Sequence, residues 1–260
     1  MLLSVLLVLR ASKQTSLETF SGKKLHGWLI HLVSRYDKEK AQELHSSEEK
    51  PFTVSLLHPE PGTYWLRVTS FEEVFSSMLE EMLGCVKEVK FGHDEYEVLR
   101  QHSEGHTWAG RSTFDELYND GLYLARKGER LVGLRFVTPT AFKLAGSRLN
   151  MPLPWPRLVF QSLANRWNAF SPIPLWIDWP DFERRVTVAK CDVRTRLLDF
   201  GHFRQVGFVG ECWFLIDPQA KLPLRHALYT LAQFAFYAGV GRKTTMGMGM
   251  VRPLQGRDTV

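Results

Sequence analysis

The chain contains little cysteine and no paired-cysteine motif. Its 260 residues include three cysteines, Cys85, Cys191 and Cys212, which are scattered and form no C-x-x-C pair. An odd number of isolated cysteines argues against a disulfide framework and against a zinc knuckle. This usage is typical of a reducing compartment, so we expect a cytoplasmic location.

Long apolar runs are also missing. An apolar stretch occupies residues 1–9, whereas a helix that crosses a bilayer needs about 20 apolar residues. No basic segment precedes the stretch and no small-residue cleavage site follows it, so it does not match a signal peptide. We expect a buried first strand here and no membrane partner.

Motifs for metals and nucleotide cofactors are absent as well. The sequence has no H-E-x-x-H and no G-x-x-x-x-G-K-[ST] pattern. No clustered set of carboxylates suggests a metal-dependent nuclease. The sequence therefore predicts no metal and no cofactor.

The overall composition is that of a soluble globular protein. Apolar residues make up 44% and charged residues 23% of the chain. The net charge of +5 favours acidic partners slightly, and it does not by itself indicate nucleic acid. The length allows one large domain or two ordinary ones.

The order of expected elements repeats along the chain. Helical and alternating apolar patterns predict β-α-β-β-α-β twice, with a charged segment at residues 37–50. In the first half we expect strands or helices at residues 1–9, 23–36, 52–57, 63–69, 71–83, 85–91 and 96–100. In the second half we expect them at 131–137, 155–170, 186–200, 203–216, 222–238 and 246–252.

This order predicts an α+β fold of two tandem ferredoxin-like (RRM-like) domains. We expect an N-terminal domain at residues 1–120 and a C-terminal domain at residues 121–260. Residues 105–120 are rich in small and polar side chains and form the least regular stretch. The domain boundary is expected there.

A glycine-rich motif follows the last expected helix. Two Gly-apolar-Gly triplets flank five residues that carry two cations and two hydroxyls. Glycine allows positive φ and close approach of a ligand, and exposed N–H groups with basic side chains suit a phosphate backbone. The alternative is a tight turn with solvated charges. We predict an RNA-binding loop at Gly239, Gly241, Arg242, Lys243, Thr244, Thr245, Gly247 and Gly249.

This motif, at the end of a doubled ferredoxin-like pattern, resembles the RAMP superfamily of CRISPR-associated proteins. Further segments resemble the endoribonucleases that cut precursor CRISPR RNA within its repeats. They are Leu29-Ile30-His31, Leu44-His45, Lys50-Pro51-Phe52-Thr53-Val54, Phe136-Val137-Thr138-Pro139-Thr140-Ala141-Phe142-Lys143, Pro152-Leu153-Pro154, Val159-Phe160-Gln161 and Arg166-Trp167-Asn168.

The resemblance implies a metal-independent reaction. The ribose 2′-OH attacks the adjacent phosphorus and leaves a 2′,3′-cyclic phosphate and a 5′-OH. By resemblance, His45 is the catalytic histidine, Lys50 a catalytic lysine and His31 the second proton-transfer group. Imidazole suits proton transfer near neutral pH, and an ammonium suits the charged phosphorane.

Structural interpretations of these residues stay open. His45 is alternatively an exposed loop histidine, His31 a partly buried helix histidine and Lys50 a solvated charge. His26 is another candidate, on a different face of the same expected helix from His31.

We also expect contacts between RNA and the second half of the chain. Lys143, Ser147 and Arg148 follow an expected strand, and Arg166 adds positive charge. The resemblance implies a CRISPR repeat RNA, often a short hairpin, as the substrate. A CRISPR effector complex is a second partner to consider, and a monomer or weak homodimer is expected.

The alternative is a non-catalytic RNA-binding subunit of such a complex. A binder needs no convergence of His45 with the glycine-rich motif, whereas a nuclease of this type does.

Overall fold

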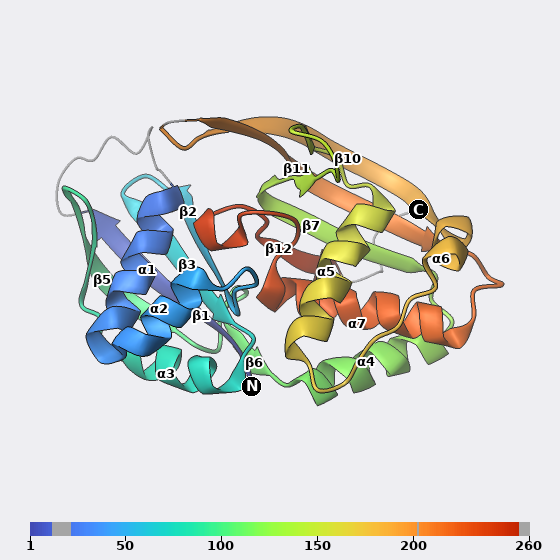
Figure 1. Ribbon diagram of the computed structural model, residues 1–260, viewed down its shortest axis with the longest axis horizontal. Helices are drawn as coiled ribbons and strands as arrows, with labels where there is room; N and C mark the ends of the chain where they lie inside the picture. The colour runs from blue at the N-terminus through green and yellow to red at the C-terminus, as the bar shows by residue number, and fades with distance from the viewer. Residues whose placement is uncertain (12–21, 202, 255–260) are drawn as a thin grey trace. The chain divides into compact units, whose positions relative to one another are not determined.

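A computed structural model describes residues 1–11, 22–201 and 203–254 (Figure 1). The chain forms two compact units. The first unit comprises Met1–Ser112 with two short segments of the second half, Asp199–Gln205 and Lys243–Gly247. The second unit comprises the remaining residues from Thr113 onwards.

The first unit has a ferredoxin-like sheet with added strands. Its strands follow the order β2-β3-β1-β5-β4, and β6 also pairs with β1. The series β5-β1-β3-β2 is the strand order of a ferredoxin-like domain, with β4 as a hairpin extension. The elements are β1 (Leu2–Ala11), α1 (Gly22–Tyr36), α2 (Lys38–Ser46), β2 (Phe52–Glu60), β3 (Thr63–Ser70), α3 (Glu73–Gly84), β4 (Glu88–Phe91), β5 (Asp94–His102), β6 (Gly110–Ser112) and the 3₁₀ turn η2 (Thr244–Met246).

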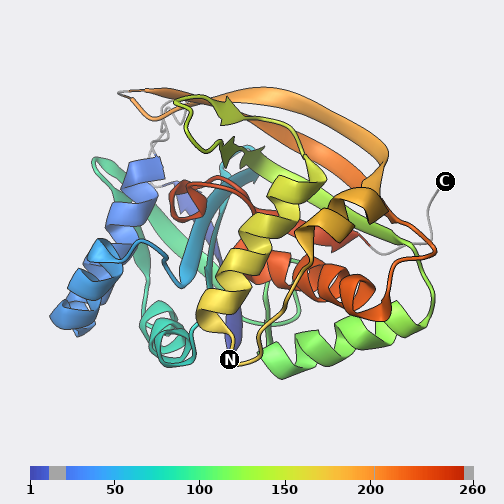
Figure 2. The same cartoon turned by 45° about the vertical axis from the view of Figure 1, so that its right-hand side comes forward.

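Strand β1 supplies the centre of this unit's core. It is antiparallel to β3, with Val5 opposite Val68 and Leu7 opposite Leu66. These four side chains are fully buried and belong to one apolar cluster with Leu29 of α1. Helices α1 and α3 cover the same face of the sheet, as Figures 1 and 2 show. The apolar run at the start of the chain is therefore a central strand, as predicted.

The second unit repeats the arrangement. Its sheet follows the order β10-β11-β7-β12, again the ferredoxin-like order. Helix α7 is buried over most of its length, because it packs against the sheet and is also contacted by α4 and α5. The elements are α4 (Phe114–Arg126), β7 (Leu131–Thr140), β8 (Phe142–Lys143), β9 (Asn150–Met151), α5 (Pro156–Phe170), α6 (Trp179–Arg185), β10 (Val186–Asp199), β11 (Arg204–Ile216), α7 (Leu222–Ala238) and β12 (Val251–Leu254).

The predicted tandem ferredoxin-like, α+β fold is confirmed. The expected helices at 155–170 and 222–238 and the long strand pair at 186–216 are present almost to the residue.

Three local predictions were wrong. The charged segment at 37–50 contains helix α2, and residues 105–120, expected to be irregular, include the start of α4. The last strand begins at Val251 rather than at residue 246, because Thr244–Met246 forms a 3₁₀ turn. Within the described residues, no helix combines the length and apolarity that a membrane span requires.

Candidate active site

Two histidines meet on consecutive helices of the first unit. His26 lies in the second turn of α1 and His45 in the last turn of α2. Their ring centroids are 6.4 Å apart. The His26 ring also stacks on Phe52 at the start of β2, with centroids 5.8 Å apart. The fully buried Phe52 thus provides a fixed surface for the His26 ring.

His26 is in an environment that favours its neutral form. Burial, followed by the Lys50 ammonium and the His45 ring, holds the pKa of His26 below its ordinary value of 6.5. A hydrogen bond to the backbone of Thr245 partly offsets this lowering of the pKa. The buried Nδ1 atom has no hydrogen-bond partner among the described residues. A neutral imidazole at neutral pH can accept a proton from a substrate hydroxyl.

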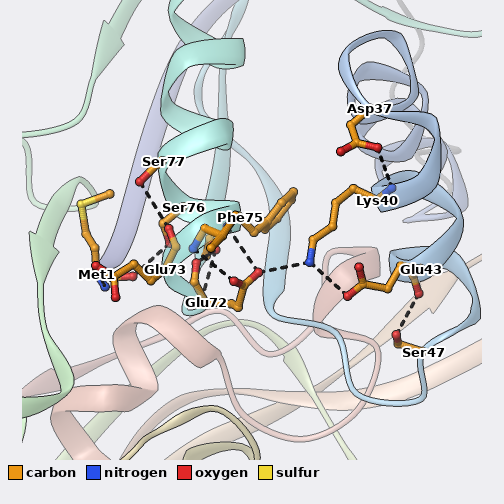
Figure 3. A network of polar contacts seen from close by, with 12 residues as sticks. Met1, Asp37, Lys40, Glu43, Ser47, Glu72, Glu73, Phe75, Ser76 and Ser77 are labelled. Atoms are coloured by element: carbon orange, nitrogen blue, oxygen red, sulfur yellow. Dashed lines mark hydrogen bonds and ion pairs between the residues drawn. The ribbon is translucent and has the colours of Figure 1, made fainter.

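Helix α2 carries His45 and is anchored at both ends. Asp37 caps its first turn by accepting a hydrogen bond from the Lys40 backbone N–H at 2.8 Å. The Lys40 ammonium lies 3.0 Å from Glu43 and 3.3 Å from Glu72, the residue that caps α3 (Figure 3). Lys40 therefore joins α2 to α3, which limits the movement of the helix that carries His45.

Lys50 holds the C-terminal end of the same helix. Its ammonium donates hydrogen bonds to the backbone oxygens of Leu44 at 2.6 Å, His45 at 3.1 Å and Ser47 at 2.7 Å. Carbonyls at a helix end lack partners within the helix and carry partial negative charge, so a cation stabilises them. Burial lowers the pKa of Lys50. The predicted catalytic role of Lys50 stays a prediction, but all three of its N–H donors already have backbone partners.

His31 does not join this cluster. It is exposed, and it follows His26 by five residues, which places the two about 140° apart around α1. His31 lines a different pocket of about 510 Å³, together with Arg35 and Tyr36 of α1 and residues of α3 and β4. Of the two α1 histidines considered from the sequence, the structure brings His26 and not His31 to His45.

The middle of the glycine-rich motif, Lys243–Gly247, packs on α1 and β2 of the first unit. The Gly247 N–H donates to the Val54 oxygen at 3.0 Å, so this segment is hydrogen-bonded to β2, the edge strand of the sheet. Thr245 reaches His26 through its backbone. The middle of the predicted loop, Lys243–Gly247, and the histidine pair thus lie within one unit.

The outer residues of the motif, 239–242 and 248–249, belong to the second unit. Gly239, Gly241 and Gly249 have positive φ, between 65° and 79°, and so has Gly247 of the first unit, at 88°. The Val240 N–H donates to the Gly249 oxygen at 2.9 Å, which joins the two triplets. The role of these residues in RNA binding stays a prediction.

Arg166 of α5 holds the first triplet in place. Its guanidinium donates to the oxygens of Ala238 at 3.1 Å, Gly239 at 3.0 Å and Gly241 at 2.5 Å. From the sequence we expected Arg166 to add positive charge where RNA binds, but in the structure its guanidinium contacts these backbone oxygens. The sequence could not show these contacts, because only the fold brings α5 to the end of α7.

A short hairpin of the second unit carries the other predicted RNA contacts. Strands β8 and β9 pair Lys143 with Asn150, and the connecting loop contains Ser147 and Arg148. Lys143 and Arg148 are exposed, whereas Ser147 accepts a hydrogen bond from the Leu149 N–H at 3.0 Å. The Arg242 guanidinium donates to the Asn150 side chain, which fixes the base of the hairpin.

Among the described residues, no group of three or more His, Cys, Asp and Glu side chains is arranged to hold a metal ion. His102 and His106, four residues apart, bring their ring centroids to 5.3 Å.

Solved structures of Thermus thermophilus Cas6 resemble this chain over nearly its whole length. The protein alone is 31% identical, with 98% of both chains covered and a TM-score of 0.73. A Cas6 product complex is 32% identical, covers 98% of this chain and 99% of its own, and has a TM-score of 0.82. The chain belongs to the Cas6 family. The family profile described as CRISPR-associated endoribonuclease Cas6 matches residues 134–251.

Two further likenesses are more limited. A CRISPR-associated endoribonuclease Cas6 of Mycobacterium tuberculosis is 33% identical over 143 residues, which are 53% of this chain and 44% of the relative. The matched part thus spans less than half of that relative. A structure described as a RAMP protein binding different RNA substrates shares the fold, with a TM-score of 0.64 at 14% identity. Membership of the Cas6 family and the RAMP-type fold agree with the resemblance found in the sequence.

Proposed function

We propose that this protein is an endoribonuclease that cleaves CRISPR repeat RNA in a precursor transcript and so generates mature crRNA. The proposed reaction needs no metal: the ribose 2′-OH attacks the adjacent phosphorus and leaves a 2′,3′-cyclic phosphate and a 5′-OH. Membership of the Cas6 family supports the substrate class, and the arrangement of His26 and His45 supports the type of reaction.

One observation carries this proposal. His26 lies beside His45, and the segment Thr244–Met246 of the glycine-rich motif packs on α1, the helix that carries His26. A protein that only binds RNA gains nothing from two imidazoles at the loop that is expected to hold a phosphate. An enzyme that cleaves RNA by transesterification needs one group to remove a proton and another to supply one.

The lowered pKa of His26 supports the following division of roles. Neutral His26 accepts the proton of the 2′-OH while an oxygen lone pair forms the new O2′–P bond. The P–O5′ bond breaks, its electron pair stays on O5′, and protonated His45 gives that oxygen a proton. Backbone N–H groups of the motif that face the phosphate would stabilise its added negative charge. In this scheme Lys50 positions His45 by holding the end of α2.

The second unit is proposed to bind the RNA away from the reacting phosphate. Exposed cations at Lys143 and Arg148 suit phosphates of a short hairpin, and they supply affinity rather than chemistry. The other proposed RNA contacts of this unit are Ser147, Gly239, Gly241, Arg242 and Gly249. In the first unit, nearer the histidines, the proposed RNA contacts are Lys243, Thr244, Thr245 and Gly247.

The decisive experiment uses a labelled repeat RNA in excess EDTA, beside the same RNA with a single 2′-deoxy substitution at the cut. Cleavage in EDTA that the deoxy substitution blocks, with a cyclic phosphate and a 5′-OH on the products, is the expected result. Cleavage that requires a divalent metal, or that leaves a 5′-phosphate, would contradict the mechanism. Tight binding without any cleavage would favour the alternative, a non-catalytic RNA-binding subunit of a CRISPR effector complex.

A further inference from the structure

The tip of the β10–β11 hairpin, Asp199–Gln205, belongs to the first unit, although most of both strands belongs to the second. Two phenylalanines at this tip, Phe200 and Phe203, stack with ring centroids 4.9 Å apart and planes inclined by 12°. The Phe200 N–H donates to the Phe203 oxygen at 3.0 Å, which closes the turn. Phe200 is buried at 3% exposure, whereas Phe203 is 37% exposed. We call these two residues the aromatic pair.

The ammonium of Lys243 lies over the rings of the aromatic pair. The Lys243 Nζ atom lies 5.2 Å from the Phe200 ring centroid and 4.6 Å from that of Phe203. Both distances are within the range of cation–π attraction. Lys243 is also the one non-glycine residue with positive φ among the described residues, at φ 57°. That conformation is unfavourable for a residue with a Cβ atom. The cation–π contact is a compensating interaction at this position.

A chain of close contacts leads from Lys243 to His26. The Met246 N–H donates to the Lys243 oxygen at 2.9 Å and so closes the η2 turn. The first residue of α1, Gly22, is packed so tightly that a Cβ atom there would lie 1.9 Å from the Met246 oxygen and 2.8 Å from Phe200. Between Lys243 and Met246 lies Thr245, the backbone partner of His26. The aromatic pair, η2 and the start of α1 are therefore closely packed against one another.

We propose that Phe200 and Phe203 are positioning residues for the cleavage reaction: by holding Lys243 they fix the segment Lys243–Gly247 against His26. This inference rests on the proposed nuclease function and assigns a role to a hairpin tip that is far from the histidines in sequence. It also gives Lys243 a role that does not depend on a contact with RNA. Neither phenylalanine needs to touch the substrate.

The contact requires an aromatic face and a cation, which suggests matched variants. Phe203→Leu keeps an apolar side chain but removes the ring, whereas Phe203→Tyr keeps the ring. Lys243→Met removes the charge from a chain of similar length, and Lys243→Arg keeps the charge. Phe203 is the better target than Phe200 because its partial exposure makes a folding defect less severe.

The kinetic test measures single-turnover cleavage at saturating repeat RNA and the Kd for the uncleavable 2′-deoxy RNA. Phe203→Leu and Lys243→Met should each slow cleavage by about tenfold to a hundredfold, the effect of a small misplacement of a reacting group. The Kd of Phe203→Leu should stay within about threefold of wild type, and Phe203→Tyr should keep the wild-type rate. The double variant should be no slower than either single variant, because both remove one interaction. Additive losses of rate, or a weakened Kd of Phe203→Leu with an unchanged rate, would overturn the proposal.

A second readout does not depend on cleavage. The imidazole of His26 can be titrated by NMR and assigned with His26→Asn. The contact with Thr245 raises the pKa of His26, while burial, Lys50 and His45 lower it. Phe203→Leu should therefore move the pKa of His26 further down, and Phe203→Tyr should not. An unchanged pKa in Phe203→Leu would contradict the inference. If the wild-type protein failed to cleave, this titration would still test the positioning role.

Discussion

The imidazole rings of His26 and His45 lie 6.4 Å apart, although 18 residues and the start of a new helix separate them in sequence. Two structural features hold this distance. Phe52 supports the His26 ring, and Lys40 ties α2 to α3. This arrangement supports the proposal that the two rings act as separate proton-transfer groups.

Removing either imidazole should abolish most of the cleavage. Single-turnover rates for His26→Ala and His45→Ala are expected to fall about 10²- to 10⁴-fold, because each removes one acid–base group. Binding of the 2′-deoxy repeat RNA should change little. His31→Ala is the matched control, since it removes a histidine from the other side of the same helix. A large loss of rate in His31→Ala with normal His26→Ala would instead support the assignment made from the family resemblance.

The cleavage rate should also depend on pH through His26. A general base must be unprotonated, so the rate falls as pH drops through the pKa of His26. Because that pKa is lowered from 6.5, the midpoint of the loss of rate should lie below pH 6.5. A rate–pH profile measured at saturating RNA tests this expectation. An acid limb centred above pH 6.5 would argue against neutral His26 as the base.

The sequence predicted the fold, but it did not show which side chains the fold brings together. Helix 155–170 has apolar residues at helical spacing, and helix 222–238 is a long, mostly apolar segment, so their positions could be predicted without tertiary information. Helix α2 was missed because only Ala41 and Leu44 of its residues are buried, which leaves little apolar pattern in a charged segment. His45 was consequently expected in a loop, although it lies on a helix.

Side-chain partners could not be read from the sequence. His26 and His31 lie on one helix, and only the position of α2 decides which of them faces His45. Arg166 and Lys50 are cations, and sequence gives no means to distinguish a phosphate ligand from a partner of backbone carbonyls. Their actual contacts depend on helix ends that the fold brings to them.

Lys50 offers a direct test of a structural role. Lys50→Gln removes the ammonium that three carbonyls share, so the free energy of unfolding of the first unit should fall by about 1–2 kcal/mol. Lys38→Gln, an exposed change at the other end of α2, is the control and should have little effect. Denaturant unfolding measures both variants. A stability equal to wild type combined with a large loss of rate would favour the catalytic role predicted from the resemblance.

The exposed cations of the β8–β9 hairpin should control the salt dependence of RNA binding. Replacing Lys143 and Arg148 with Gln removes two charges, so the slope of log K against log salt should flatten by about 1.4–1.8 if both contact phosphates. The control is the equal charge change at Lys127 and Lys221, which are exposed elsewhere in the second unit. A Kd titration series over several salt concentrations distinguishes the two pairs. Equal slopes for both double variants would show that the two hairpin cations do not contact RNA phosphates.

Gly121 of α4 should be indispensable for the packing of the second unit. A Cβ atom at this position would lie 2.1 Å from the Thr230 hydroxyl oxygen and 2.7 Å from the Thr230 backbone nitrogen of α7. Because α7 is buried, neither atom can withdraw without a shift of the helix. Gly121→Ala should therefore destabilise the unit by about 1–3 kcal/mol, the cost of overpacking.

The control for Gly121 is a second helical glycine with open space around it. No atom lies within 4 Å of a Cβ atom built at Gly27 of α1. Gly27→Ala should raise the free energy of unfolding by up to about 1 kcal/mol, because alanine favours helix more than glycine. The same substitution is thus expected to have opposite signs at the two positions in thermal or denaturant unfolding. Destabilisation by Gly27→Ala and tolerance of Gly121→Ala would contradict the close approach of α4 and α7.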